Sequence, residues 1–230
     1  YDPETNLIFY GTGNPAPWNS HLRKGDNLYT ASTLALDPET GTIKWHYQTT
    51  PHDGWDFDGV NEFIPFDATI NGKVMKLGAK ADRNGYFFVL DRTNGKFISA
   101  NKFVMQTTWA SGYTKDGKPI VIPAGRPGAA QGTEKGTSVF SSPSFLGGKN
   151  WMPMAINPHT SIIFMPTFNL CMDMEFVEQE YKRGAFYLAA DFEIGTPGPG
   201  GFMGEAIAWD PVKQEALWRN KEALPYVGGM

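Results

Sequence analysis

Two acidic residues, Asp56 and Asp58, stand one residue apart in the stretch TTPHDGWDFDGVNE, residues 49–62. The surrounding residues resemble the edge of a buried strand, where an ionised carboxylate is costly unless something pairs with it. Side chains at positions i and i+2 of a strand point the same way, roughly 6.5–7 Å apart, so this pair can meet one cation. The alternative is a turn in which both carboxylates cap backbone amides.

The elements that must position these acids are short strands. Long amphipathic helical stretches are scarce, whereas β-rich runs flanked by Gly, Asn, Asp and Pro recur. Three runs place an Asp third: ALDPETGTIKW (35–45), VLDRTNGKFIS (89–99) and AWDPVKQEALW (208–218). Asp37 and Asp91 are 54 residues apart, and Asn157 and Asp210 are 53 apart. A period near 50 residues indicates the blades of a β-propeller, with a β-sandwich as the alternative.

The Asp turns also predict how the blades are built. Each Asp would cap its own hairpin turn while Gly or Asn takes the position with positive φ. Trp45 and Trp218, which end two of the runs, would dock against neighbouring blades. At roughly 50 residues per blade, the chain supplies four to five blades. We therefore expect an all-β arc of a larger ring, with a strand edge exposed at each end.

Composition excludes several classes of protein. The 230 residues are 41% hydrophobic and 19% charged, which favours a folded chain over a disordered one. A net charge of −4 gives no basic face for nucleic acid. Cys171 is the only cysteine, so no disulfide forms within the chain. The sequence begins without Met, and we expect residues 1–230 to be a single propeller segment, truncated at both ends, with any export signal outside it.

Several segments together resemble the pyrroloquinoline quinone (PQQ) dependent alcohol dehydrogenases. The resemblance covers nearly the whole chain, in the order of the family's motifs, which is more specific than any single motif. It implies four to five blades of an eight-bladed propeller, with the quinone and a metal ion near the central axis. The segments are GTGNPAPWN (11–19), RKGDNLYT (23–30), YQTTPHDGWDFDGVNE (47–62), KADRNGYFFVLDRTNGK (80–96), TTWASG (107–112) and LGGKNWMPMAINPHT (146–160).

The resemblance assigns metal ligands and a base. Asp56 matches the family's general base, and Asn14, in GTGNP, matches an amide-oxygen ligand. An Asp at position 58 resembles the lanthanide-dependent members, in which an extra carboxylate offsets the third charge of the ion. Two alternatives stay open: a calcium-dependent enzyme with Asp58 turned to a backbone amide, and Asn14 as a loop residue that caps a turn.

The resemblance also assigns residues to the quinone. Arg83, in ADRNG, matches an active-site arginine that hydrogen-bonds the quinone oxygens, although it could instead pair with Asp82 or Asp91. Asn150 and Trp151, in GGKNW, match a segment that contacts the quinone, with packing between blades as the alternative for Trp151.

Other chemically capable residues carry weaker predictions. His52 is interpreted as a structural, hydrogen-bonded histidine. Two roles stay open for Trp109: it lines a substrate cavity, or it packs a blade. The family's remaining Glu ligand, its adjacent cysteine pair and its stacking tryptophan have no counterpart here, and we expect them to precede Tyr1.

The resulting hypothesis is an oxidoreductase that converts small primary alcohols to aldehydes with PQQ and a lanthanide ion, or alternatively Ca²⁺. By resemblance the electron acceptor is a cytochrome c and the location is periplasmic; the oligomeric state is left open, a homodimer included. The competing hypothesis is a non-catalytic propeller that serves as a scaffold or binding module. An enzyme requires Asn14, Asp56, Asp58 and Arg83 to lie together, whereas separations above ~12 Å would contradict it.

Overall fold

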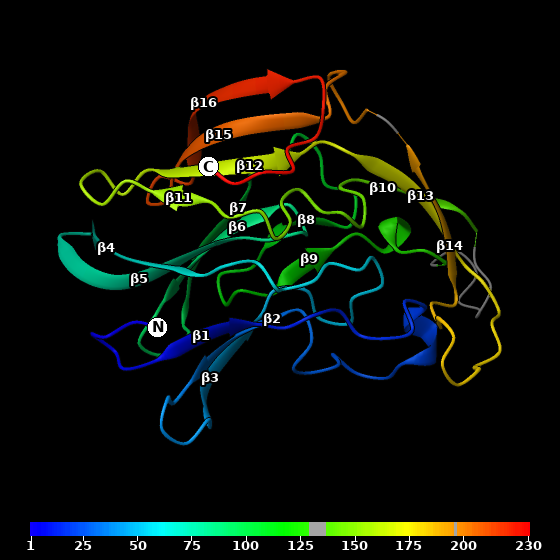
Figure 1. Cartoon of the computed structure of the whole chain (residues 1–230), viewed down its shortest axis with the longest axis horizontal. Coiled ribbons are helices and arrows are strands. Elements are labelled where there is room, and N and C mark those ends of the chain that lie inside the picture. The colour runs from blue at the N-terminus through cyan, green and yellow to red at the C-terminus, as the bar shows by residue number, and fades with distance from the viewer. Residues whose placement is uncertain (129–136, 196) are drawn as a thin grey trace.

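The protein is built almost entirely of antiparallel β-sheet (Figure 1). The computed structural model describes residues 1–128, 137–195 and 197–230. The helical segments among the described residues are two single 3₁₀ turns, η1 (Ser20–Leu22) and η2 (Pro123–Gly125). None of the described helices is long and apolar enough to cross a membrane. The all-β prediction is confirmed.

Three sheets form the body of the molecule and lie one above another in Figure 1. The first sheet comprises β1 (Ile8–Gly11), β2 (Ser32–Leu36) and β3 (Ile43–Gln48). The second comprises β4 (Ile64–Ile70), β5 (Lys73–Ala81), β6 (Tyr86–Asp91) and β7 (Phe97–Lys102). The third comprises β11 (Ala155–Ile156), β12 (Ile163–Phe168), β15 (Gly204–Asp210) and β16 (Glu215–Glu222).

Two smaller sheets flank this stack. One pairs β8 (Ala110–Tyr113) with β9 (Pro119–Val121). The other, on the right of Figure 1, joins β10 (Val139–Ser141), β13 (Cys171–Phe176) and β14 (Ala190–Gly195). Strands β13 and β14 follow β12 in the chain and precede β15, so they are an insertion within the third sheet.

The Asp turns have the predicted chemistry. Asp37 follows β2, Asp91 ends β6 and Asp210 ends β15, so each stands at the hairpin before the last strand of its sheet. One carboxylate oxygen of each accepts a hydrogen bond from the backbone two residues later, at 2.9–3.0 Å. Gly41 and Gly95 supply the positive φ values, 69° and 75°. The local sequence therefore closes these hairpins without help from distant residues.

One of the two spacings behind the predicted period has a different origin. Asn157 lies in the β11–β12 turn and Asp210 in the β15–β16 turn, so their 53-residue interval falls within the third sheet. The inserted β13–β14 hairpin lengthens that sheet's sequence to the size of a whole repeat. Only the interval from Asp37 to Asp91 separates successive sheets.

The core lies between successive sheets, and β6 shows why. Its side chains are nearly all buried, since both faces of the second sheet are covered. Phe87 and Val89 pack with Met165 of the third sheet. Leu90, on the opposite face, packs with Trp45 of the first sheet. The period-2 alternation of one strand thus joins three sheets in a stack.

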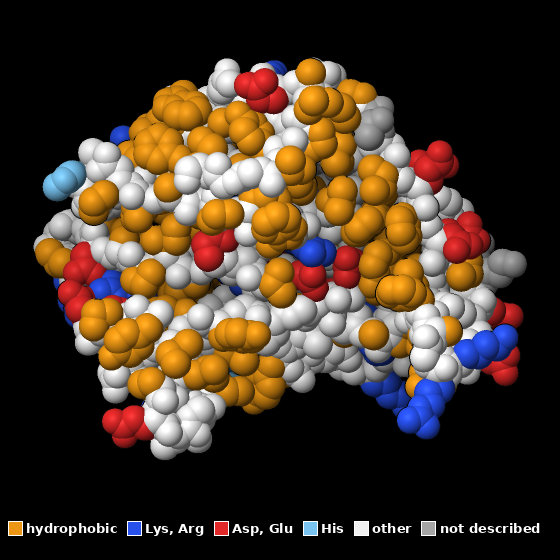
Figure 2. Space-filling model, viewed as in Figure 1, with side chains coloured by type: hydrophobic (Ala, Val, Ile, Leu, Met, Phe, Trp, Pro, Cys, Tyr) orange, Lys and Arg blue, Asp and Glu red, His pale blue; other side chains and the backbone are white. Residues whose placement is uncertain are grey.

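The two repeat-end tryptophans differ in their surroundings. Trp45 is 8% exposed, and its Nε1 donates to the Arg92 carbonyl of the second sheet at 3.2 Å, as predicted for docking between blades. Trp218, on edge strand β16, is 46% exposed and contacts Phe164 of its own sheet. Figure 2, drawn in the view of Figure 1, shows hydrophobic side chains gathered over the upper and lower parts of the face turned to the viewer. Docking of Trp218 on a second sheet is not found among the described residues.

Candidate active site

The segment that carries Asp56 and Asp58 is a loop between β3 and β4, so the prediction of a strand is wrong. The Asp53 carboxylate accepts hydrogen bonds from the backbone N–H groups of Trp55, at 2.9 Å, and Phe57, at 3.0 Å. These two bonds flank Asp56, whose φ of 65° is in the left-handed region that Asp tolerates better than bulky residues. Asp53 therefore folds the loop around Asp56.

The apolar residues of the loop anchor it in the core. Trp55 and Phe57 are fully buried, stack on each other at 5.9 Å between ring centroids, and contact Trp109. The Arg126 guanidinium lies 4.4 Å from the Trp55 ring centroid. Because the aromatic rings face inward, Asp56, which lies between them, and Asp58, which follows Phe57, face the opposite side. The two carboxylates therefore share a direction, as predicted, but a turn rather than a strand provides it.

Both carboxylates converge on the guanidinium of Arg83. Arg83 Nη1 lies 3.1 Å from Asp56 Oδ2, and Arg83 Nη2 lies 2.8 Å from Asp58 Oδ2. All three side chains are 12–16% exposed, so these ion pairs are screened much less than surface pairs. The structure thus rules out the alternative in which Arg83 pairs with Asp82 or Asp91.

Neighbouring turns bring Arg83 to this position. It lies in the turn between β5 and β6, and Gly147 approaches so closely that an added Cβ would lie 2.6 Å from the Arg83 Cα. Gly147 has a φ of 84°, which also favours glycine. Arg83 Nη1 additionally donates to the carbonyls of Asp56, at 3.1 Å, and Phe145, at 3.3 Å. The guanidinium orientation is therefore set by two separate loops.

Asn150 lies on the same guanidinium, and Trp151 follows it at the surface. Asn150 Oδ1 accepts from Arg83 Nη2 at 3.3 Å, and its Nδ2 donates to the Leu146 carbonyl at 2.8 Å. Trp151 is 69% exposed, so it does not pack between blades within the described residues. Contact with a cofactor therefore stays the prediction for Trp151, whose ring is exposed beside Asn150.

Asn14 reaches the site through its backbone. Its N–H donates to Asp58 Oδ1 at 2.5 Å, while its side-chain Nδ2 donates to the Pro15 carbonyl at 3.1 Å. Asn14, Asp56, Asp58, Arg83 and Asn150 are thus linked by direct contacts in one cluster. The separation that would contradict an enzyme is not present.

Burial makes the Asp56 carboxyl an unusually weak acid. The pKa of its carboxyl is raised to about 8, chiefly by removal from water and also by the charges of Asp58 and Asp53, while Arg83 opposes the rise. A carboxyl with a pKa near the operating pH is suited to accept a proton from a substrate. A metal cation beside it would favour the ionised form and lower that pKa.

The oxygen donors fit a hard metal ion. Two carboxylates that already face one cation, with the Asn150 amide oxygen on the same guanidinium, match the ligand preference of Ca²⁺ and of trivalent ions of similar hardness. Within the described ranges, no group of three or more His, Cys, Asp and Glu side chains could hold an ion. The two carboxylates would therefore supply only part of an oxygen shell, and the metal ligands predicted from the sequence stay a prediction.

Two residues with weaker predictions from the sequence, Trp109 and His52, are structural. Trp109 is fully buried, and its Nε1 donates to the Asn84 carbonyl at 2.8 Å, so it packs the core. His52 Nδ1 lies 2.7 Å from the Gly25 carbonyl, as predicted for a structural histidine. Sequence reasoning missed Asp53 and the buried Lys80, which hold the acid loop from either side. The only signal for Asp53 was its position two residues before Trp55, the offset of an Asx turn.

Comparison with known proteins gives one consistent result. Residues 1–120 match the model of the PQQ family described as glucose/ethanol/alcohol dehydrogenase, β-propeller domain. The quinoprotein alcohol dehydrogenase PedH of Pseudomonas putida is 56% identical over 230 residues, covering all of this chain and 38% of that protein. A lanthanide-dependent methanol dehydrogenase of Methylorubrum extorquens is 39% identical over 236 residues, covering all of this chain and 39% of that protein.

Solved structures agree. A europium-containing methanol dehydrogenase superposes with a TM-score of 0.89 at 39% identity, covering 98% of this chain and 39% of that one. The chain thus spans about two fifths of the length of the relatives that it matches. Sequence and fold agree, and the chain belongs to the β-propeller family of PQQ-dependent glucose, ethanol and alcohol dehydrogenases.

Proposed function

We propose that this chain contributes catalytic and metal-binding residues to a quinoprotein that oxidises small primary alcohols to aldehydes. The observation that carries the proposal is the convergence of Asp56 and Asp58 on the guanidinium of Arg83. A scaffold has no need to hold two carboxylates and an arginine together at 12–16% exposure. Because the chain spans about two fifths of its relatives, the activity, substrate and partners of the whole protein are part of the proposal.

Each residue of the cluster has a role in this proposal. Asp56 takes the proton of the alcohol hydroxyl, which requires its ionised form. Arg83 donates hydrogen bonds to the oxygens of the cofactor and stabilises the negative charge that develops there. Asn150 and Trp151 complete the contacts with the cofactor. When bound, PQQ supplies the hydride acceptor and a metal ion supplies the Lewis acid for its carbonyl.

Asn14, Asp56 and Asp58 are the proposed metal ligands, and a lanthanide is the proposed ion. The third charge of such an ion favours a second carboxylate. Relatives named lanthanide-dependent and europium-containing support this choice. One contact favours the calcium alternative: the Asn14 N–H donates to Asp58 Oδ1, so one oxygen of Asp58 is turned to a backbone amide.

Other features of the whole protein are proposed from the family alone. They are a single propeller segment over residues 1–230, a cytochrome c as electron acceptor and a periplasmic location. The oligomeric state stays open, with a homodimer among the possibilities. Reduction of an added cytochrome c, cell fractionation and light scattering of the purified protein test the last three, respectively.

The metal ion is the feature that an experiment can decide most directly. The full-length protein is stripped of metal, loaded with PQQ, and titrated with La³⁺ or Ca²⁺ while alcohol-dependent dye reduction is followed. We expect La³⁺ to restore activity in the wild type and not in Asp58→Ala. Asp173→Ala removes an exposed acid on β13, outside the site, and is the matched control.

Three results would change the assignment. Equal restoration of wild type and Asp58→Ala by La³⁺ would show that Asp58 is not a ligand. Restoration of the wild type by Ca²⁺ alone would favour the calcium enzyme. Absence of turnover with either ion, in protein that is folded and holds PQQ, would favour the scaffold.

A further inference from the structure

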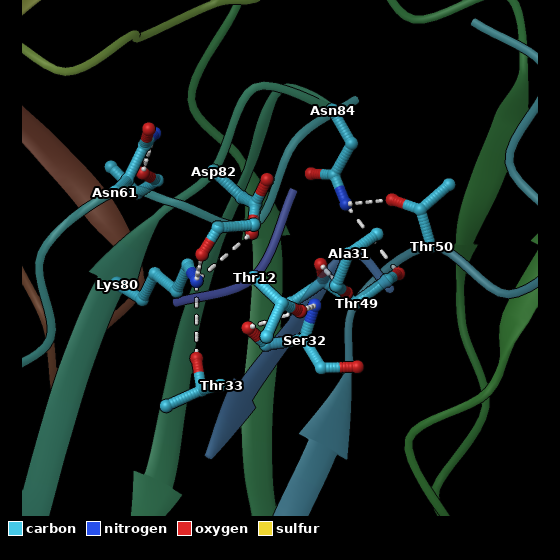
Figure 3. Close-up of polar contacts among 12 residues, drawn as sticks. Thr12, Ala31, Ser32, Thr33, Thr49, Thr50, Asn61, Lys80, Asp82 and Asn84 are labelled. Carbon is cyan, nitrogen blue, oxygen red and sulfur yellow. Dashed lines mark hydrogen bonds and ion pairs between the residues drawn. The ribbon is translucent and has the colours of Figure 1, made fainter. Parts of the chain in front are cut away.

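A buried ion pair lies directly behind the acid loop, between Lys80 on β5 and Asp82 in the turn that follows. Lys80 is 1% exposed and Asp82 is fully buried, with Lys80 Nζ 3.6 Å from Asp82 Oδ2. Lys80 Nζ also donates to Thr33 Oγ1 on β2, at 3.1 Å, and to the carbonyl of Gly59. Figure 3 shows the Lys80 ammonium between Thr33 and Asp82, where the first and second sheets meet.

This pair is costly for the fold alone. Burial lowers the pKa of Lys80 and raises that of Asp82, while each charge opposes the shift of the other. A buried ion pair often stabilises a protein no better than apolar residues of similar volume. Its position beside the site therefore calls for a reason other than core stability.

The pair closes a ring through the active-site cluster. Gly59, whose carbonyl the Lys80 ammonium holds, directly follows Asp58 in the chain. Asp82 directly precedes Arg83. Arg83 and Asp58 in turn contact each other at 2.8 Å. The ion pair of Lys80 and Asp82 thus joins the loop of Asp58 to the turn of Arg83. Asp58 and Arg83 themselves form a second ion pair.

The peptide at Gly59 has little room to move. A Cβ added at Gly59 would lie 2.6 Å from the Ser32 nitrogen, and the Gly59 N–H donates to the Thr12 carbonyl at 2.8 Å. Two residues later, Asn61 Nδ2 donates to the Ala81 carbonyl at 2.7 Å. The loop after Asp58 is therefore held on several sides, and the Lys80 ammonium is the charged group that contacts the Gly59 carbonyl.

We propose that Lys80, balanced by Asp82, is a positioning residue that holds the Asp58 carboxylate against Arg83 in the geometry needed to receive a metal ion. Lys80 acts through the Gly59 carbonyl and touches neither substrate nor metal. The inference rests on the proposed function, because it assigns a purpose to the geometry of Asp58. It predicts that loss of the ammonium loosens the metal site before it unfolds the protein.

The test compares four variants of the full-length protein, one of them a control, with the wild type. Lys80→Met removes the ammonium but leaves the Asp82 carboxylate buried without its cation, so Lys80→Met/Asp82→Asn removes both charges and preserves folding better. Thr33→Val removes one acceptor of the ammonium and leaves both charges. Arg92→Met is the matched control, because Arg92 is 4% exposed and pairs with Asp2 and Glu4 in a turn remote from the acid loop.

Two readouts separate positioning from stability: La³⁺ affinity of the metal-free protein by calorimetry, and thermal unfolding. We expect the double variant to bind La³⁺ at least tenfold more weakly while still unfolding cooperatively. Thr33→Val should weaken binding about threefold. Arg92→Met should lower the unfolding temperature and leave La³⁺ affinity within twofold of the wild type.

The outcomes distinguish this inference from the function on which it rests. A folded double variant with La³⁺ affinity within twofold of the wild type would overturn the positioning role and leave the proposed function intact. Equal weakening in Arg92→Met would also overturn it, because general destabilisation would then explain the loss. Wild-type protein that binds neither La³⁺ nor Ca²⁺ would contradict the proposed function and this inference together.

Discussion

The hairpin turn at Asp37 and the acid loop that starts at Asp53 use the same local device with different results. In both, an Asp carboxylate accepts hydrogen bonds from backbone N–H groups that follow it. The pKa of Asp37 is lowered to about 2, mainly by the Lys44 side chain, at an exposed turn. Burial instead raises the pKa of Asp53 to about 6. An Asx turn in water only closes a hairpin, whereas the buried one also orients a reactive neighbour.

Substitutions of two arginines, the partly buried Arg83 and the buried Arg92, make the sharpest test of this contrast. Arg83→Met should reduce kcat/KM by about 10²–10³, because it removes the cation that faces the developing charge and holds both carboxylates. Arg92→Met, in a repeat turn, should lower stability and leave kcat/KM nearly unchanged. Steady-state kinetics and thermal unfolding of both proteins check this. Similar kinetic losses in the two variants would remove the distinction between the regions.

Removal of the carboxylate that shapes the acid loop should have the next largest effect. Asp53→Ala leaves two buried N–H groups without acceptors, at a cost of about 2–4 kcal/mol in the free energy of unfolding. It also frees Asp56, so kcat should fall about tenfold or more. Denaturant titration and kinetics measure the two effects. Unchanged kcat in a destabilised variant would show that the loop keeps its shape without Asp53.

The two aspartates should also respond to pH in opposite directions. The pKa of Asp53 is raised above its ordinary value, so its contribution to stability is present at low pH and is lost as pH rises through about 6, by up to about 3 kcal/mol. The contribution of Asp37, whose pKa is lowered, is present above pH 4 and is lost as pH falls through about 2.

Unfolding measurements at pH 4.5 and pH 7 test the first of these statements. Relative to the wild type, Asp53→Asn should gain stability as the pH rises, because the amide carries no charge to desolvate. A difference in stability that does not change between the two pH values would mean that Asp53 titrates normally in the folded protein.

The smallest expected effect concerns the exposed turn. Asp37→Ala removes two hydrogen bonds at the surface, where water replaces the lost acceptor. The unfolding temperature should fall less than in Asp53→Ala, and kcat should stay the same. A loss of activity in Asp37→Ala would mean that the first sheet communicates with the site in a way that its contacts do not show.

The sequence predicted the repeat turns with their hydrogen bonds, whereas for the cluster it predicted the residues but not the loop that holds them. The Asp turns were predictable because their donors and acceptors lie within three residues of one another. The strand predicted at Asp56 and Asp58 was wrong because the alternation of aromatic and acidic residues looks the same in a strand and in a loop clamped by Asp53. The 53-residue spacing between Asn157 and Asp210 does not separate two successive sheets. It lies within one sheet, which the β13–β14 insertion lengthens to the size of a repeat.

By itself, the sequence determined the all-β class, the hairpin turns and the residue types at the site. These depend on side-chain period and on hydrogen bonds between near neighbours. Only the tertiary structure decided that Arg83 pairs with Asp56 and Asp58 rather than with Asp82 or Asp91, and that Lys80 lies against Gly59. Such contacts join residues more than 20 positions apart, so they exist only after the sheets have packed and excluded water.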